Sequence, residues 1–385
     1  MTQHVDEAEP HRKRSWRVVL PTAVFALIAL LWAGFWYYAE SKAEAALADW
    51  RGREARSGRI YSCGSQTFGG FPFRIEVRCA DPSVQVLKTQ PPFLLKANNL
   101  LAVAQAYDPT LLIAEVTGPL TLADPGRPPN LIVDWTSARA SVRGASGGPQ
   151  RVSVVLDKPK FSRPDADAQG GRSTLLASAE HMEWHGRVAG GSLSDNPVLD
   201  VAVNLVKASA PGLSPLASEP IDADVTAQLT GLRDLAPKSW AERFREIQAN
   251  GGHLDITSAR VQQGGVLAVA TGTLRISPHG RLDGDLQVSI AGIEKLLPAL
   301  GLDQLLASLA DNGNLGSIVG QLDRLMPGLG GLVRSQSGAR GRAAAADLGR
   351  PTQVEGRRAL TLPLRFSDGA VFLGPFAIGQ TPPVY

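Results

Sequence analysis

The longest apolar run in the chain lies near its N-terminus. Residues 18–39 carry no formal charge and would form a helix about 33 Å long, enough to cross the hydrocarbon core of a bilayer. We therefore predict a transmembrane anchor over 18–39, preceded by a cytoplasmic tail over 1–17. A cleaved secretory signal is the alternative, because Ala43-Glu44-Ala45 resembles a cleavage site, although signal cores are usually shorter than this run.

The charges around this run predict its orientation. A basic cluster in residues 12–17 precedes the span, whereas the charges that follow it are mixed, so the N-terminus is expected in the cytoplasm. Aromatic residues at both ends, Trp16 and 35–38, are typical of the interfacial belts of a membrane span. The rest of the chain is then expected in the periplasm, which makes the protein a single-pass protein of the inner (plasma) membrane.

Beyond the anchor, apolar and polar residues alternate in short runs. Such runs occupy 151–156, 199–205 and 281–290. The clearest apolar set is Leu282, Leu286, Val288 and Ile290. A period of two indicates antiparallel strands with one buried and one solvated face. Strands and helices do not alternate in the βαβ order that is typical of a parallel sheet, so a parallel sheet is not expected. We predict a mainly β fold: a large curved antiparallel sheet, shaped as a trough, a sandwich or a barrel, with a few covering helices.

Turn and helix signals divide the expected periplasmic domain, residues 59–385. Asp368-Gly369 predicts a tight hairpin between strands at 359–366 and 370–377. A capping box over 239–242 predicts the start of a short helix. The remaining helical patterns are a stalk over 40–58 and an insert at about 293–326, which a flexible connection over 327–351 follows.

The composition narrows the possible functions. Aromatic residues make up 6% of the chain, so its core must be built mainly from Val, Leu, Ile and Ala. The net charge of +3 is too small to favour nucleic acid as a partner, and none is expected. The 40 glycines and 27 prolines, without a collagen period, suit many turns and short strands.

The two cysteines of the chain, Cys63 and Cys79, both follow the anchor. In an oxidising periplasm a disulfide between them would persist, and closing a loop of this size would stabilise the fold by roughly 3 kcal/mol. Two free buried thiols or a metal pair are the alternatives, but the spacing is not that of a zinc site and no histidine lies nearby in the sequence. We predict a disulfide and no metal or other cofactor.

A distinctive motif lies between the cysteines and consists of Gly70, Phe71, Pro72, Phe73 and Arg74. Proline restricts the residue before it to extended geometry and removes a backbone donor where a strand begins. Phe71 and Phe73 are then expected to point in the same direction. We interpret the motif as a packing anchor that the disulfide holds in place.

Motifs of catalysis or metal binding are weak, and we assign no catalytic residue. Residues 144–148 match the G-x-S-x-G pattern, but they run into Pro149 rather than a helix, which favours a loop. His181, Glu183 and His185 would share one face of a strand, where a metal is conceivable but a solvated face is the commoner arrangement. The protein is therefore not expected to be an enzyme.

Together these elements carry a family resemblance. The motif 70–74 with its flanking cysteines resembles the proteobacterial family of unknown function numbered 2125 (DUF2125). A second part of the resemblance is a segment near the C-terminus made of Asp368, Gly369, Phe372, Leu373, Gly374 and Pro375. The resemblance spans nearly the whole chain and implies no particular activity. More distantly, an anchor with a long β body looks like the AsmA-like envelope proteins, whose curved sheets are associated with moving or organising lipids.

The leading hypothesis is a non-enzymatic envelope protein that binds membrane lipid or another apolar ligand on its sheet. The expected lining is the apolar set of 281–290, because we expect this face to be only partly used by the protein's own core. The alternative is a scaffold or assembly factor that binds another envelope protein through a sheet edge. A third class, a cryptic hydrolase, would need a polar cluster that the sequence does not show.

Overall fold

The computed structural model of the chain describes residues 16–89, 91–144, 148–165, 173–211, 215–236, 238–292, 350–373 and 376–385. The helices in these ranges are α1 (Trp16–Arg56), α2 (Trp240–Ala249) and the short 3-10 helix η1 (Pro215–Ser218). The predicted helical insert at 293–326, and the predicted connection up to residue 349, lie outside the described residues.

The first strands are β1 (Arg59–Ser62), β2 (Ser65–Gly69), β3 (Arg74–Ala80), β4 (Ser83–Val86), β5 (Phe93–Lys96), β6 (Asn99–Gln105), β7 (Leu111–Thr117), β8 (Leu120–Ala123), β9 (Pro129–Asp134), β10 (Ser137–Arg143), β11 (Arg151–Asp157), β12 (Lys160–Pro164) and β13 (Ser173–Ser178). The remaining strands are β14 (His181–Ser192), β15 (Asp195–Ala208), β16 (Ile221–Leu229), β17 (His253–Gln263), β18 (Val266–Ile276), β19 (Leu282–Ala291), β20 (Arg350–Val354), β21 (Arg357–Ser367), β22 (Ala370–Leu373) and β23 (Phe376–Gln380).

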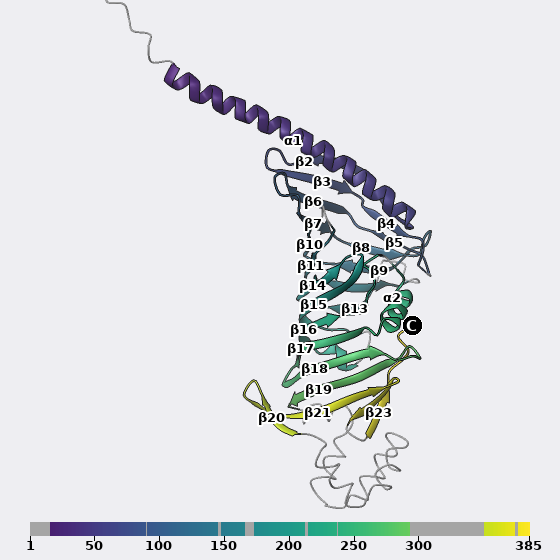
Figure 1. The fold of residues 1–385 in the computed structure, drawn as a ribbon. Coiled ribbons are helices and arrows are strands. Elements are labelled where there is room, and N and C mark those ends of the chain that lie inside the picture. The colour runs from purple at the N-terminus through teal and green to yellow at the C-terminus, as the bar shows by residue number, and fades with distance from the viewer. Residues whose placement is uncertain are drawn as a thin grey trace, which may run out of the picture.

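These strands form two antiparallel sheets (Figure 1). The short sheet has the order β1-β4-β5-β8-β9-β12-β13. The long sheet has the order β2-β3-β6-β7-β10-β11-β14-β15-β16-β17-β18-β19-β21-β22-β23, with β20 paired to β21. The predicted mainly β, antiparallel fold is confirmed, and neither sheet closes into a barrel within the described residues.

The two sheets meet along a line of bends, here called the fold line. β3 and β11 of the long sheet lead directly into β4 and β12 of the short sheet. The bends lie at Asp81 and Lys158, which have φ of 48° and 51° and each precede a proline. Hydrogen bonds continue through the bends, since the amide of Asp81 donates to the carbonyl of Asn98 at 2.9 Å. The two sheets are therefore continuous with each other across the fold line, and the chain bends from one sheet into the other there.

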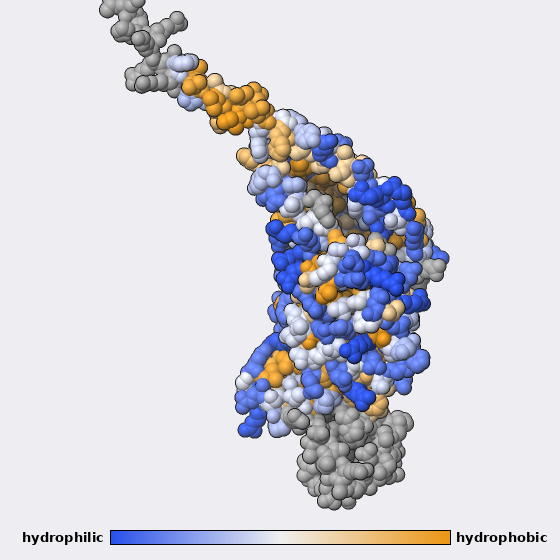
Figure 2. All heavy atoms as spheres, in the orientation of Figure 1, coloured by the Kyte–Doolittle hydropathy of each residue, from blue (hydrophilic) through white to orange (hydrophobic). Residues whose placement is uncertain are grey.

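The apolar faces of the two sheets turn toward each other. Val133 of the short sheet and Ala138 of the long sheet lie on either side of the fold line, and both are buried. Val133 pairs with Leu120, and Ala138 pairs with Leu156, so each belongs to the apolar face of its sheet. The outward face of the long sheet is mainly polar, with apolar exceptions such as the exposed Ile113, and Figure 2 shows a mostly hydrophilic surface over the β body on the side drawn. The result is a trough with an apolar interior.

α1 joins the predicted anchor and the predicted stalk in one continuous helix. Residues 19–31 of α1 are exposed and mostly apolar, and Figure 2 shows this part of the helix as the most hydrophobic surface in the view. By length and composition this helix is able to cross a membrane. From Trp32 onward, partly buried residues recur at helical spacing on one side of the helix.

This second part of α1 packs on the β body, so the predicted stalk is not a rod surrounded by solvent. Figure 1 shows the helix passing over β2 and β3. Trp36 packs with Ile75 and Ala106 in a buried cluster. Further along, the ring of Trp50 lies 4.5 Å from that of Tyr61 on β1. Because α1 covers the end of both sheets, the first strands are not left as open edges.

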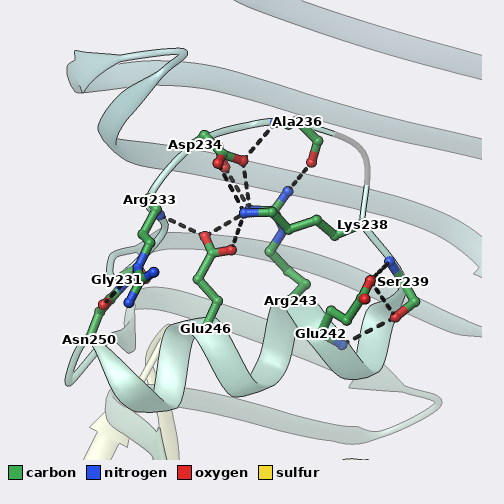
Figure 3. A network of polar contacts seen from close by, with 10 residues as sticks. All are labelled: Gly231, Arg233, Asp234, Ala236, Lys238, Ser239, Glu242, Arg243, Glu246 and Asn250. Carbon is green, nitrogen blue, oxygen red and sulfur yellow. Dashed lines mark hydrogen bonds and ion pairs between the residues drawn. The ribbon is translucent and has the colours of Figure 1, made fainter. Parts of the chain in front are cut away.

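α2 begins at the capping box that the sequence predicts. The hydroxyl of Ser239 accepts a hydrogen bond from the amide of Glu242, and the Glu242 carboxylate accepts one from the amide of Ser239 at 2.9 Å. At its other end, the side chain of Asn250 donates to the carbonyl of Gly231 at 2.9 Å. Figure 3 shows that both ends of the helix are thereby tied to the preceding loop.

Between these ends, Glu246 is the centre of a charged network (Figure 3). Its carboxylate accepts hydrogen bonds from the amide of Arg233 at 2.7 Å, from Arg243 at 2.9 Å and from Lys238. Burial raises the pKa of Glu246, but the hydrogen bonds to Lys238 and Arg233 more than offset this effect and leave it below its ordinary value. The network holds α2 on its loop, and its charges are satisfied within the protein.

The C-terminal hairpin is partly as predicted. Asp368-Gly369 connects β21 to β22, with Ser367 paired to Ala370. The expected strand over 370–377 is wrong, because β22 ends at Leu373 and β23 returns antiparallel to it. Proline 375 lies between them in the sequence, and a proline cannot donate to a strand ladder.

Candidate functional site

A continuous row of apolar residues crosses the inner face of the long sheet. It contains one residue from every strand from β2 to β21 in the sheet order, each in register with the next. The row, called here the apolar stripe, consists of Phe68, Val77, Ala102, Ala114, Ala140, Val154, Trp184, Val203, Val225, Ala259, Ala270, Val288 and Leu362. With neighbouring strands about 4.8 Å apart, the stripe is roughly 55–60 Å long.

The residues of the stripe are incompletely covered. Most are of intermediate exposure, Trp184 is 43% exposed, and only Leu362 is buried. Trp184 lies over Gly186, where a Cβ atom would approach its ring to 3.1 Å. A glycine at 186 therefore leaves room for this indole on the inner face. A row of partly exposed apolar residues of this length is able to contact an apolar ligand.

The predicted lining residues lie on this face. Leu282, Leu286, Val288 and Ile290 all lie on β19 and are partly buried. Val288 belongs to the stripe, and Leu286 lies in the adjacent row, where it pairs with Gly272 and Leu364. The structure thus brings these residues together as one side of a strand, and it adds Trp184, which the sequence argument did not single out.

At the end of the β body that α1 covers, the two cysteines and the motif between them meet this helix. Cys63 and Cys79 form a disulfide with their Cα atoms 5.5 Å apart, as predicted. A guanidinium nitrogen of Arg51 lies 3.3 Å from the sulfur of Cys63. The disulfide therefore joins β3 to the segment before β2 directly beneath α1.

The turn over residues 70–74 contacts the aromatic residues of α1. The indole nitrogens of Trp32 and Trp36 donate to the backbone carbonyls of Pro72 and Arg74, each at 2.8 Å. Gly70 has φ of 101°, and a Cβ atom there would lie 2.6 Å from the carbonyl oxygen of Arg74, so only glycine fits. Phe71 and Phe73 remain largely exposed, so the predicted packing anchor holds through the backbone of the turn more than through its two rings.

The outer face of the long sheet carries a depression of about 740 Å³ across β11 and β14–β17, with several charged residues in its lining. Within it, Asp200 accepts hydrogen bonds from Arg187 and, at 2.9 Å, from Gln228. The bond from Arg187, and then that from Gln228, lower the pKa of Asp200. A carboxylate ionised and paired in this way is a poor general base, so the depression does not identify an active site.

The histidine pair of the sequence lies on the same outer face, and His185 lines this depression. Glu183 bridges the two rings, at 2.7 Å from His181 and 2.9 Å from His185, and Asp157 lies 2.7 Å from the other nitrogen of His181. Hydrogen bonds to Glu183 and then Asp157 raise the pKa of His181, and the same histidines lower that of Glu183. Among the described residues, no group of three or more His, Cys, Asp or Glu side chains is arranged to hold a metal ion.

The fold therefore defines a class: an antiparallel β protein with an apolar N-terminal helix able to span a membrane. The model of a bacterial family described as an uncharacterized protein conserved in bacteria (DUF2125) matches residues 36–382, and the chain belongs to this family. The match begins at Trp36, so it includes the half of α1 that packs on the β body. No curated protein matches the chain. The more distant likeness to AsmA-like proteins stays an expectation.

Proposed function

We propose that α1 anchors this protein in the bacterial inner membrane, that the β body lies in the periplasm, and that the apolar stripe binds the acyl chains of lipids without catalysis. The observation that carries this proposal is the stripe itself, which is continuous from β2 to β21 and only partly covered. The Cys63–Cys79 disulfide supports an oxidising compartment for the β body.

The energetics of lipid burial suit such a surface. An acyl chain that leaves a bilayer for water loses about 0.8 kcal/mol for each methylene group exposed. The stripe begins beneath α1 and would give an acyl chain new apolar contacts as it leaves the bilayer. Transfer of the acyl chain from the bilayer to the stripe then needs little net free energy. The side chains of the stripe are non-polar, and they would bind many acyl chains without selecting one headgroup.

Site-specific photocrosslinking in cells tests this proposal. p-Benzoylphenylalanine would replace Val225 of the stripe and, as the matched control, Asp224, the neighbouring residue on the exposed face of β16. β16 lies on the order of 35 Å from β3 at about 4.8 Å per strand, so lipid that surrounds α1 does not reach it. Mass spectrometry of the purified chain should find lipid adducts from position 225 and not from 224.

Two other results would contradict lipid binding. The absence of lipid adducts at both positions, with efficient incorporation of the crosslinker, would refute it. A protein adduct at position 225, in place of lipid, would favour the alternative function as a scaffold or assembly factor for another envelope protein.

A further inference from the structure

The turn between β2 and β3 lies beside the end of the apolar span of α1. The two indole hydrogen bonds place Pro72 and Arg74 beside Trp32 and Trp36. The ring of Phe73 lies 6.3 Å from that of Trp32, and the ring of Phe71 lies 5.4 Å from that of Trp36. Any membrane that the end of this span enters therefore also meets the turn.

The length of α1 before Trp32 indicates that the periplasmic edge of the hydrocarbon core lies at the level of the turn. The uncharged residues before Trp32, 18–31, form about 21 Å of helix, whereas a hydrocarbon core is about 30 Å thick. The missing length, about six residues, must come from 32–37, which include the two tryptophans that contact the turn. Phe71 and Phe73 then lie at the periplasmic edge of the hydrocarbon.

The side chains at this level are those that membrane interfaces favour. Phe71 is 54% exposed and Phe73 is 64% exposed, and Tyr107 beside them is 63% exposed. The amide of Ala106 donates to the carbonyl of Phe73 at 3.0 Å, which holds Tyr107 next to the turn. Large exposed aromatic rings are unfavourable in water, but they are enriched where an apolar ring meets the headgroup layer.

Cationic side chains lie on the strand that follows. Arg74 and Arg78 both pair with the buried Glu76, at 2.5 and 2.6 Å, and both keep much of their side chains exposed. Two guanidinium groups and one carboxylate leave a net positive charge next to the aromatic turn. This charge complements the phosphates of a lipid headgroup layer.

We propose that the turn over residues 70–74, together with Tyr107, is a second membrane contact that inserts Phe71 and Phe73 into the periplasmic leaflet. The partner is the lipid bilayer, and the contact holds the first strands, and with them the start of the apolar stripe, on the membrane surface. This inference depends on the membrane anchor of the proposed function. It does not depend on lipid binding along the stripe.

Spin labels on the full chain in vesicles of phosphatidylethanolamine and phosphatidylglycerol test the contact. One nitroxide would be attached at Phe73→Cys, with Ile28→Cys in the span and Arg358→Cys on the distant β21 as controls, and the native disulfide left unreduced. Accessibility to oxygen and to a water-soluble nickel complex would report depth. Positions 73 and 28 should be protected from nickel, and position 358 should be open to it.

The possible results separate the proposals. A label at 73 that is as open to nickel as the label at 358, with 28 protected, overturns the turn insertion and leaves the anchor intact. A label at 28 that is open to nickel overturns the anchor and with it both proposals.

A second measurement uses the same turn without a label. The double variant Phe71→Ser, Phe73→Ser should lower lipid crosslinking from p-benzoylphenylalanine at Tyr107, which is exposed and lies outside the stripe, several-fold and leave crosslinking from Ile28 unchanged. Tryptophan at both positions should restore it. Unchanged crosslinking from Tyr107 in the serine variant would contradict a role of the two rings in membrane contact.

Discussion

A carboxylate at position 288 distinguishes an open apolar face from a sealed core. Val288 lies on β19 in register with Ala270 and Leu362, and it is partly exposed. Gln287 is the matched control, because it is the preceding residue and lies exposed on the opposite face of the same strand. Val288→Asp and Gln287→Asp thus introduce the same carboxylate on the two sides of one sheet.

The expected size of the effect follows from the exposure of Val288. An unpaired carboxylate in a sealed core would destabilise the fold by about 4 kcal/mol or more. At a partly open position the carboxylate keeps much of its hydration. The free energy of unfolding then falls for two reasons. The variant loses part of the roughly 1.5–3 kcal/mol that burial of a valine contributes, and aspartate has a strand propensity that is less favourable by up to about 1 kcal/mol. We expect a destabilisation of about 2 kcal/mol for Val288→Asp and at most about 1 kcal/mol for Gln287→Asp.

Thermal unfolding of the full chain in detergent, followed by circular dichroism, measures both variants. At about 2–4 °C for each kcal/mol in a domain of this size, Val288→Asp should lower the unfolding temperature by about 4–8 °C. Lipid crosslinking from position 225 should fall several-fold in Val288→Asp and stay unchanged in Gln287→Asp. If Val288→Asp fails to fold while Gln287→Asp folds normally, Val288 lies in a sealed core and the argument for an open stripe is wrong.

Three further predictions test topology, the disulfide and pH dependence. Alkaline phosphatase fused after Tyr385 should be active, and an inactive but well-expressed fusion would reverse the orientation. Thiol labelling of the unreduced, denatured chain should find neither Cys63 nor Cys79 free, and two reactive thiols would contradict the bond. The pKa of His181 is raised above 6.5, so its stabilising contribution is complete below pH 6.5 and is lost as the pH rises through the folded-state value. His181→Asn should therefore reduce the fall in unfolding temperature between about pH 6 and 9, and equal falls in both proteins would refute this linkage.

The sequence was sufficient to predict the strand faces but not the folding of the ladder into two sheets. Alternation with period two depends only on which side of a strand is buried, so the apolar side of 281–290 was readable. Asp81-Pro82 and Lys158-Pro159 signal equally plainly that a strand ends. Such a signal does not say whether the chain then reverses in one sheet or bends into another, because that depends on the neighbouring strands.

The packing of α1 on the β body was also missed, for a related reason. Tryptophans at the end of an apolar helix are typical of a membrane interface, and Trp36 fits that pattern. It is nonetheless 3% exposed, because it packs on Ile75. The available signal was the spacing of Trp36, Ala43 and Trp50, which places three apolar residues on one side of a helix that extends beyond the membrane.

The unequal length of the two sheets explains why one half of the trough is the better candidate for a ligand. The short sheet ends with β13, whereas the long sheet continues from β14 through β23. Where sheet faces sheet, the apolar faces are able to cover each other, and Val133 and Ala138 are buried there. Ser178 at the end of β13 forms a bridge with Ser209, which follows β15, and within the described residues the short sheet contains no strand after β13. The stripe from Val203 to Val288 is of intermediate exposure, so we expect a lipid chain to cover this part, and the first half of the stripe leads back to α1.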